Sequence, residues 1–269
     1  MQRAIGLAAL TVLELAPPDI VTCASQAGYD FVGLRLLPAT EAETRHPIVG
    51  DTPLVRETAM RLADTGLYVL DIELFRLAPD TDVRDYRAAL ETGARLGARE
   101  ALVAGSDPDT LRLVDRFRAL CALAAEFGMG VGLEPMPWTD IRDYVQGARI
   151  VEAVGCDNAG LVIDPIHFDR AGSRPDQIAL APPRCLRYMQ LCDAPAERPA
   201  DIETVIHQAR AERLMPGDGG LDLRGILRAA PADIPVSVEV PMRTLARSVP
   251  AARRAREILA KTRRLLDSL

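Results

Sequence analysis

Several residue types and motifs are scarce in this chain of 269 residues, and each scarcity argues against a class of chemistry. Lysine is nearly absent, with Lys261 in the last predicted helix, which argues against a Schiff-base aldolase. The five cysteines are scattered and form no Cys-x-x-Cys pair, which disfavours a zinc–thiolate site and a disulfide framework. We therefore expect free thiols in a reducing compartment.

Long apolar runs and strong positive charge are also missing. No segment approaches the length of about 20 apolar residues that crosses a bilayer, and residues 1–7 carry no cleavage signature. We therefore expect a cytoplasmic protein without a membrane partner. The net charge of −6 argues against nucleic acid as a main partner, because phosphate binding requires basic patches. No nucleophile elbow supports a Ser/His/Asp hydrolase.

Short apolar strands alternate with helical segments along the whole chain. Strands are predicted at residues 4–7, 29–36, 67–73, 99–104, 130–134, 159–164, 186–191 and 235–240. Helices are predicted at residues 17–28, 51–66, 80–97, 107–127, 139–154, 174–180, 201–210, 222–228 and 249–266. Eight such units in about 250 residues predict one α/β domain over residues 1–269, a single (β/α)8 TIM barrel. Two doubly wound domains are the alternative, but the Gly-rich dinucleotide turn that they need is missing.

Oxygen-bearing side chains stand at or near the carboxyl ends of the last four predicted strands. They are Glu134, Asp164, Gln190 and Glu239. Barrel active sites lie at this end, and neighbouring strands are about 4.8 Å apart, so the four residues can converge. Three carboxylates and one amide oxygen suit one divalent cation, Mn²⁺ or Mg²⁺, better than zinc. Each residue alone could equally be a solvated group at the barrel rim.

The same residues resemble the xylose isomerase-like TIM barrel superfamily, the sugar phosphate isomerase/epimerase group. The family pattern places Glu on strand five, Asp-x-x-His on strand six, His or Gln on strand seven and Glu on strand eight. Here Asp164 and His167 supply the Asp-x-x-His motif, and residues 216–219 resemble the family's Gly-Glu-Gly loop. Gln190 departs from the histidine usual in the isomerases and resembles the metal-dependent 3-dehydroshikimate dehydratases. Met136 stands where some of those dehydratases carry a histidine.

The resemblance implies a metal-dependent isomerase or epimerase that acts on a small polyhydroxylated carbonyl substrate through an enediolate. It implies Glu134 and Glu239 as the acid/base pair, with Asp164 and Gln190 as ligands only. Loss of a β-hydroxyl from the same enolate would give a dehydratase, which is the runner-up. A barrel that binds metal and sugar without turnover is the third reading. Barrels of this type often form homodimers, although no interface is evident in the sequence.

Further residues near the predicted site have two readings each. His167 could orient substrate or act as an acid, or it could hold Asp164. Arg213 could pair with a substrate carboxylate or phosphate, or lie solvated in its loop. Trp138 could form an apolar wall over a sugar ring, or it could pack against its own loop. Arg35 and Glu73 could contact the substrate, or they could form a salt bridge at the barrel mouth.

Overall fold

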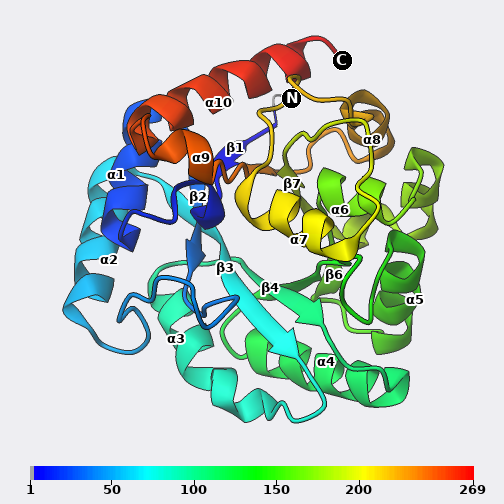
Figure 1. The fold of residues 1–269 in the computed structure, drawn as a ribbon. Coiled ribbons are helices and arrows are strands. Elements are labelled where there is room, and N and C mark those ends of the chain that lie inside the picture. Colours follow the sequence, from blue (N-terminus) through cyan, green and yellow to red (C-terminus); the bar gives the residue numbers. More distant parts are fainter. Residues whose placement is uncertain (1–2) are drawn as a thin grey trace.

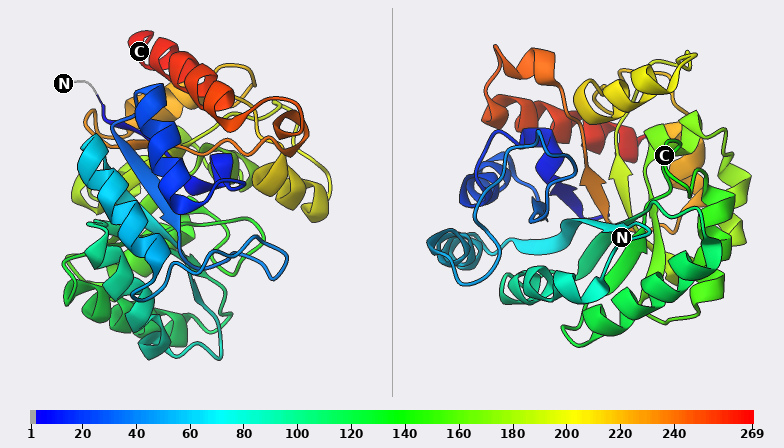
Figure 2. Two further views of the ribbon diagram at one scale, coloured as in Figure 1. Left: turned by 90° about the vertical axis from the view of Figure 1, so that its left-hand side faces the viewer. Right: turned by 60° about the horizontal axis from the view of Figure 1, so that its bottom comes forward.

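The computed structural model describes residues 3–269 and shows eight parallel strands that close into one barrel, β8 pairing with β1 (Figures 1 and 2). The strands are β1 (Ile5–Leu7), β2 (Phe31–Arg35), β3 (Tyr68–Leu77), β4 (Glu100–Gly105), β5 (Gly130–Leu133), β6 (Ala159–Ile163), β7 (Leu186–Leu191) and β8 (Val236–Val238). Strand order follows chain order throughout. The predicted (β/α)8 TIM barrel is therefore confirmed.

Helices surround the barrel, and their apolar faces pack on the strands to form the main core (Figure 1). The α-helices are α1 (Pro17–Ala27), α2 (Pro53–Thr65), α3 (Arg87–Arg95), α4 (Thr110–Ala125), α5 (Tyr144–Val154), α6 (Pro165–Arg170), α7 (Ile202–Ala211), α8 (Leu223–Ala229), α9 (Arg243–Ala246) and α10 (Ala251–Asp267). The 3₁₀ helices are η1 (Ala9–Val12), η2 (Val83–Tyr86), η3 (Pro175–Leu180) and η4 (Pro183–Cys185). Within the described residues, no helix has the length and apolar character needed to cross a membrane.

The helix predicted for residues 139–154 begins later than expected, at Tyr144. The buried hydroxyl of Thr139 lies 2.9 Å from the carbonyl oxygens of Met136 and Ile141, which holds the chain in a turn. The helix starts only after Asp143, whose carboxylate accepts a hydrogen bond from the amide of Gln146 at 2.9 Å. A capping aspartate of this kind sets a helix start more strongly than residue propensity does.

Other local predictions also needed correction. Residues 174–180, predicted as a helix, contain the 3₁₀ helix η3, and the segment 80–97 is divided between η2 and α3. The short helices α6 and α9 were not predicted. Helix α6 begins directly after Asp164, whose carboxylate accepts from the Ile166 amide at 3.0 Å. The residue predicted as a metal ligand is therefore also a helix cap.

A partly buried ion pair lies in the barrel near the amino ends of the strands. Arg187 on β7 contacts Glu100 on β4 with an Nη2–Oε1 distance of 2.5 Å. Two glycines on the intervening strands make room for it. A Cβ atom at Gly130 would lie 2.0 Å from Nη2 of Arg187, and one at Gly160 would lie 2.4 Å from its Cδ. Burial raises the pKa of Glu100, and the opposing charge of Arg187 only partly offsets this shift. Keeping the Glu100 carboxylate ionised inside the barrel therefore costs solvation free energy.

We predict that Glu100→Ala lowers the free energy of unfolding by about 3 kcal/mol, because it leaves the Arg187 guanidinium without a partner inside the barrel. Urea unfolding followed by circular dichroism measures this change. The matched control is Glu91→Ala, which removes the partner of Arg95 from an exposed ion pair and should cost less than about 1 kcal/mol. Equal losses in the two variants would contradict the role assigned to the interior pair.

Candidate active site

Four side chains meet where β5, β6, β7 and β8 end. Glu134, Asp164 and Glu239 each stand at or just past the end of their strand, and Gln190 is the penultimate residue of β7. All four are buried. Because these strands are consecutive neighbours in the barrel, their carboxyl ends lie side by side. The structure therefore brings together the four residues that the sequence indicated.

His167 joins this cluster from the first turn of α6. One ligand atom from each of Glu134, Asp164 and His167 lies within 4.8 Å of the others. The Nε2 atom of His167 is 3.6 Å from Oε1 of Glu134 and 3.6 Å from Oδ2 of Asp164. Burial lowers the pKa of His167 to about 4, although the charge of Asp164 opposes the shift. The imidazole is therefore neutral at pH 7, and these contacts are not ion pairs.

Arg213 is a buried member of the site and does not lie solvated in its loop. Its Nη1 atom is 2.7 Å from Oδ2 of Asp164, and its Nη2 atom is 2.9 Å from Oε2 of Glu239. Its Nε atom donates to the carbonyl oxygen of Ala209 at 2.7 Å. Burial alone would raise the pKa of Asp164, but Arg213 together with His167 lowers it below its usual value. Asp164 is therefore ionised at neutral pH.

Asp193, which follows Gln190 closely, fixes the segment that carries Arg213. Its backbone pairs with Leu214, with N–O distances of 2.9 and 2.8 Å. Its carboxylate accepts hydrogen bonds from the amides of Gly217 and Gly219, both at 3.0 Å. A Cβ atom at Gly219 would lie 2.3 Å from the carbonyl oxygen of Ala194, so a side chain does not fit there. The glycine-rich loop therefore wraps the Asp193 carboxylate.

Arg35 and Glu73 form an ion pair at the barrel mouth, with an Nη2–Oε2 distance of 2.9 Å. The pair belongs to the site, because the amide nitrogen of Gln190 donates to Glu73 at 3.4 Å and to Glu239 at 3.2 Å. Burial raises the pKa of Glu73 to about 8, against the opposing charge of Arg35. Gln190 thus connects two carboxylates that come from opposite parts of the barrel.

Two buried oxygen atoms of the cluster lack a hydrogen-bond partner among the described residues. They are Oε1 of Glu134 and Oε1 of Gln190. Gln190 gives its amide hydrogens to glutamates, so its oxygen stays free to bind a cation. A free amide oxygen beside three carboxylates is a hard, all-oxygen donor set. The ligand atoms of Glu134, Asp164 and His167 lie close enough together to hold one cation, and the set of Glu134, Asp164, Gln190 and Glu239 stays a prediction.

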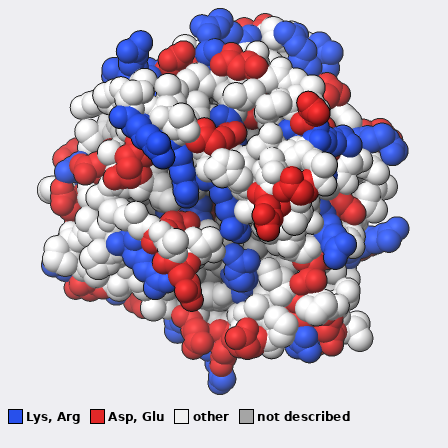
Figure 3. All heavy atoms as spheres, viewed as in Figure 1, with Lys and Arg blue, Asp and Glu red and all other residues white. Residues whose placement is uncertain are grey.

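A small cavity opens above the cluster, with an empty volume of about 440 Å³. Trp138 lines it, and its ring packs edge-on against His167 with centroids 4.9 Å apart. Two further lining residues, Arg76 and Arg210, were missed by sequence reasoning. The sequence offered one signal for Arg210, its short spacing from the candidate residue Arg213. In the space-filling view, basic side chains gather near the centre of this face (Figure 3).

The closed barrel and the buried cluster of carboxylates at the ends of β5 to β8 define the class of protein. It is a TIM barrel whose polar centre lies at the carboxyl ends of its strands. The model of the xylose isomerase-like TIM barrel family matches residues 21–265, and the chain belongs to this family. The resemblance noted from the sequence is therefore confirmed.

Curated relatives have more than one activity. The chain is 31% identical over 132 residues to a 3-dehydroshikimate dehydratase of Pseudomonas aeruginosa, a match that covers 48% of this chain and 20% of that protein. It is 25% identical over 157 residues to an inosose isomerase of Bacillus velezensis, covering 55% of this chain and 54% of that protein. The matches thus span about a fifth and about half of the relatives' lengths.

A solved structure described as IolI protein with a bound zinc atom superposes with a TM-score of 0.79. Its sequence is 19% identical, and the match covers 98% of both chains. At this identity the superposition establishes the shared fold. Together, the relatives show that enzymes of several reaction classes use this barrel.

We predict that the cation-free protein becomes less stable as pH rises from about 5 to 8. Burial raises the pKa of Glu239 in the fold to about 8 from 4.5, so the folded chain binds more protons than the unfolded chain in this window. The unfolded chain loses its proton first as pH rises, so stability falls through this window and levels off above about pH 8, where the folded form also loses that proton. Melting temperatures in EDTA at several pH values measure the slope. Glu239→Gln removes this contribution and should make the slope shallower, while Glu73, whose pKa is also raised to about 8, keeps part of it. An unchanged slope would contradict the assignment.

Proposed function

We propose that this protein is a divalent-cation-dependent isomerase or epimerase that moves a proton next to the carbonyl of a small polyhydroxylated substrate. The main supporting observation is a pair of buried glutamates, Glu134 and Glu239, that line one cavity from strands three positions apart. Proton transfer between two positions of a substrate needs two such groups, one as base and one as acid. The relatedness to an inosose isomerase supports the same reading.

The proposed cation is held by Glu134, Asp164, Gln190 and Glu239, and the oxygen-only donor set favours Mn²⁺ or Mg²⁺. The zinc atom of the structural relative supports a divalent cation in this fold. The chemistry that such a cation supplies is polarisation of a carbonyl oxygen, which acidifies the neighbouring C–H bond. The side chains around the cavity transfer the protons and orient the substrate.

The two glutamates are prepared differently for proton transfer. Burial raises the pKa of Glu134 well above its usual value, and the charges of Asp164 and Glu239 raise it further. Glu239 is held by Arg213 through Oε2, which opposes the effect of burial on its pKa. Both glutamates therefore favour their protonated forms in the cation-free protein, and a bound cation would lower their pKa values so that one of them could act as the base. In the epimerase reading, one takes the proton from carbon and the other returns it to the opposite face.

The surrounding side chains orient the substrate in this proposal. His167 is neutral and buried, and its Nε2 atom is close to both Glu134 and Asp164, so it can contact a substrate hydroxyl beside them. Trp138 supplies an apolar wall for the carbon skeleton. Arg213 fixes the positions of Asp164 and Glu239, so we assign it a positioning role.

A dehydratase is the second candidate, favoured by Gln190 and by the relatedness to a 3-dehydroshikimate dehydratase. The first step is the same loss of a carbon-bound proton to a glutamate. The β-hydroxyl then leaves as water after receiving a proton from the second acid, and a carbon–carbon double bond forms. The same residues therefore serve both reactions, and the position of the leaving hydroxyl in the substrate decides between them.

We expect the protein with added Mn²⁺ to exchange a carbon-bound proton with solvent when incubated in D₂O with inososes, ketoses or 3-dehydroshikimate. Mass spectrometry and NMR distinguish an epimer or isomer of unchanged composition from a product that has lost water. Glu134→Gln and Glu239→Gln should each lower the rate by about 100-fold or more, because each removes an acid or base. Glu91→Gln, a change in an exposed ion pair, is the control.

Metal binding is measured on the same proteins. Mn²⁺ affinity should fall in Asp164→Asn and Glu239→Gln, because each replaces a carboxylate of the donor set. Equal, weak Mn²⁺ binding in the wild type and both variants would contradict the metal site and the enzyme reading with it. Tight binding of Mn²⁺ and of a sugar with no turnover of any substrate would instead favour a binding protein.

A further inference from the structure

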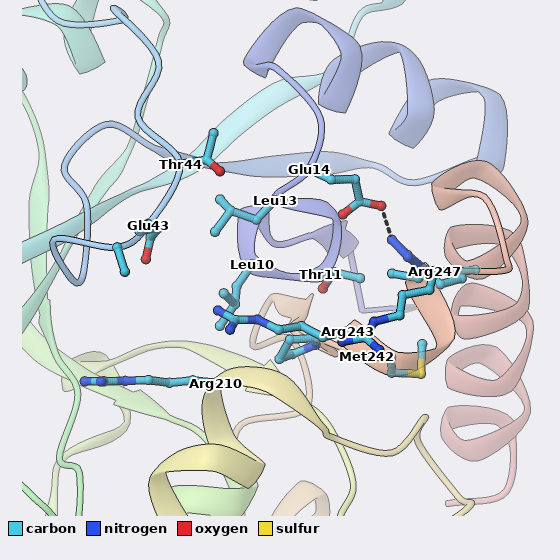
Figure 4. Close-up of a pocket in the computed structure, with 14 residues that line it drawn as sticks. Leu10, Thr11, Leu13, Glu14, Glu43, Thr44, Arg210, Met242, Arg243 and Arg247 are labelled. Carbon is cyan, nitrogen blue, oxygen red and sulfur yellow. Dashed lines mark hydrogen bonds and ion pairs between the residues drawn. The ribbon is translucent and has the colours of Figure 1, made fainter.

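A second cavity lies beside the barrel mouth, between η1 and the segment that follows β8 (Figure 4). We call it the arginine cavity, because Arg210, Arg243, Arg247 and Arg254 line it. Arg210 comes from the end of α7, Arg243 and Arg247 from α9 and the residue after it, and Arg254 from the first turn of α10. The cavity is open to solvent on one side.

The arginine cavity carries an excess of positive charge in a protein whose net charge is −6. Its two carboxylates already have cationic partners. Glu14 pairs with Arg254, and Glu43 lies 3.6 Å from Nε of Arg35. Among residues 3–269, no ion pair is formed by Arg210, Arg243 or Arg247. Arg243 and Arg247 are exposed and Arg210 is half-buried, so the lining contains three guanidinium groups without an ion-pair partner among the described residues.

Arg254 adds buried, unused hydrogen-bond donors to this wall. Its side chain is 1% exposed, and only its Nη2 atom has a partner, the carboxylate of Glu14. Its Nε and Nη1 atoms have no hydrogen-bond partner in the part of the chain that the structure describes. A buried donor left without a partner costs about 1–3 kcal/mol. A water molecule, an ion or a ligand group is what supplies the missing partner of such a donor.

Arg210 connects the arginine cavity to the candidate active site. It lines both the arginine cavity and the cavity above Glu134 and Glu239, as does Leu10. Burial lowers the pKa of Arg210, and the neighbouring charge of Arg76 lowers it further. Its guanidinium lies 5.6 Å from the ring of Trp138. Arg210 and Leu10 thus form a wall common to the two cavities.

We propose that the arginine cavity binds an oxyanion group of the substrate, a phosphoryl or a carboxylate group, while the carbonyl end of the substrate reaches Glu134 and Glu239. The proposal rests on the proposed function and names its substrate class, an anionic polyhydroxylated carbonyl compound. Guanidinium groups suit such an anion because they donate two parallel hydrogen bonds to its oxygens. A neutral sugar would leave these charges unused.

The test titrates the Mn²⁺-loaded protein with inorganic phosphate and, separately, with acetate, followed by calorimetry. The cavity variant is the double substitution Arg243→Gln and Arg247→Gln. The control removes the same charge from two exposed arginines elsewhere, Arg84→Gln and Arg174→Gln. We expect the cavity variant to lose at least 10-fold in affinity for phosphate, for acetate or for both, and the control to match wild type. A loss seen with phosphate indicates that the cavity binds a phosphoryl group, and a loss seen with acetate indicates that it binds a carboxylate group.

Two results overturn the proposal. One is equal anion affinity in the wild type and the cavity variant, and the other is no measurable binding of either anion to the wild type. Once a substrate is found, the cavity variant should raise KM for it by at least 10-fold with little change in kcat. An unchanged KM for an anionic substrate would also overturn the proposal.

The same titrations separate this proposal from the proposed function. Mn²⁺ affinity of the cavity variant should equal that of wild type, since neither arginine contacts the four residues of the metal set. Anion binding lost with Mn²⁺ binding intact assigns the defect to the arginine cavity. If instead Asp164→Asn and wild type bind Mn²⁺ equally weakly while anion binding is intact, the proposed function fails and the cavity remains an anion site of another purpose.

Discussion

The ion pairs of the buried Arg213 with Asp164 and Glu239 are the constraint on which the candidate site depends. Carboxylates taken out of water repel one another and tend to bind protons unless a cation faces them. Arg213 meets this requirement from a segment that is itself fixed by the backbone pairing of Asp193 with Leu214. The connection between β7 and β8 is therefore part of the site's electrostatics.

Charge compensation by Arg213 is incomplete. The Oε1 atoms of Glu134 and Gln190 remain without hydrogen-bond partners, and burial keeps the pKa of Glu134 high. A site balanced in this way can accept one more cation and one more proton. That property suits the proposed proton transfer next to a carbonyl, a first step that the two candidate reactions share. In the proposal made above, the arginines in the cavity walls select the substrate.

Local patterns predicted the strands well and the helix starts less well. The four residues at the strand ends could be read from sequence because burial on both faces of a parallel strand leaves a short apolar run with a polar end. The late start of α5 could not be predicted from the sequence, because it depends on the Thr139 turn. Helix α6 could not be predicted either, because it depends on the cap from Asp164. These contacts compete with helix propensity, and propensity alone does not show which one prevails.

The sequence by itself determined the alternation of strands and helices, the closed barrel and the four oxygen-bearing residues, since each follows from short-range patterns and strand order. Only the tertiary structure decided that Arg213 is buried, that His167 approaches Glu134, and that Arg210, Arg243, Arg247 and Arg254 line one cavity. Arg210 and Arg213 come from a different segment than Arg243, Arg247 and Arg254, and η1 meets the segment after β8 only because β8 pairs with β1. Contacts made by closure of the barrel leave no local signal in the sequence.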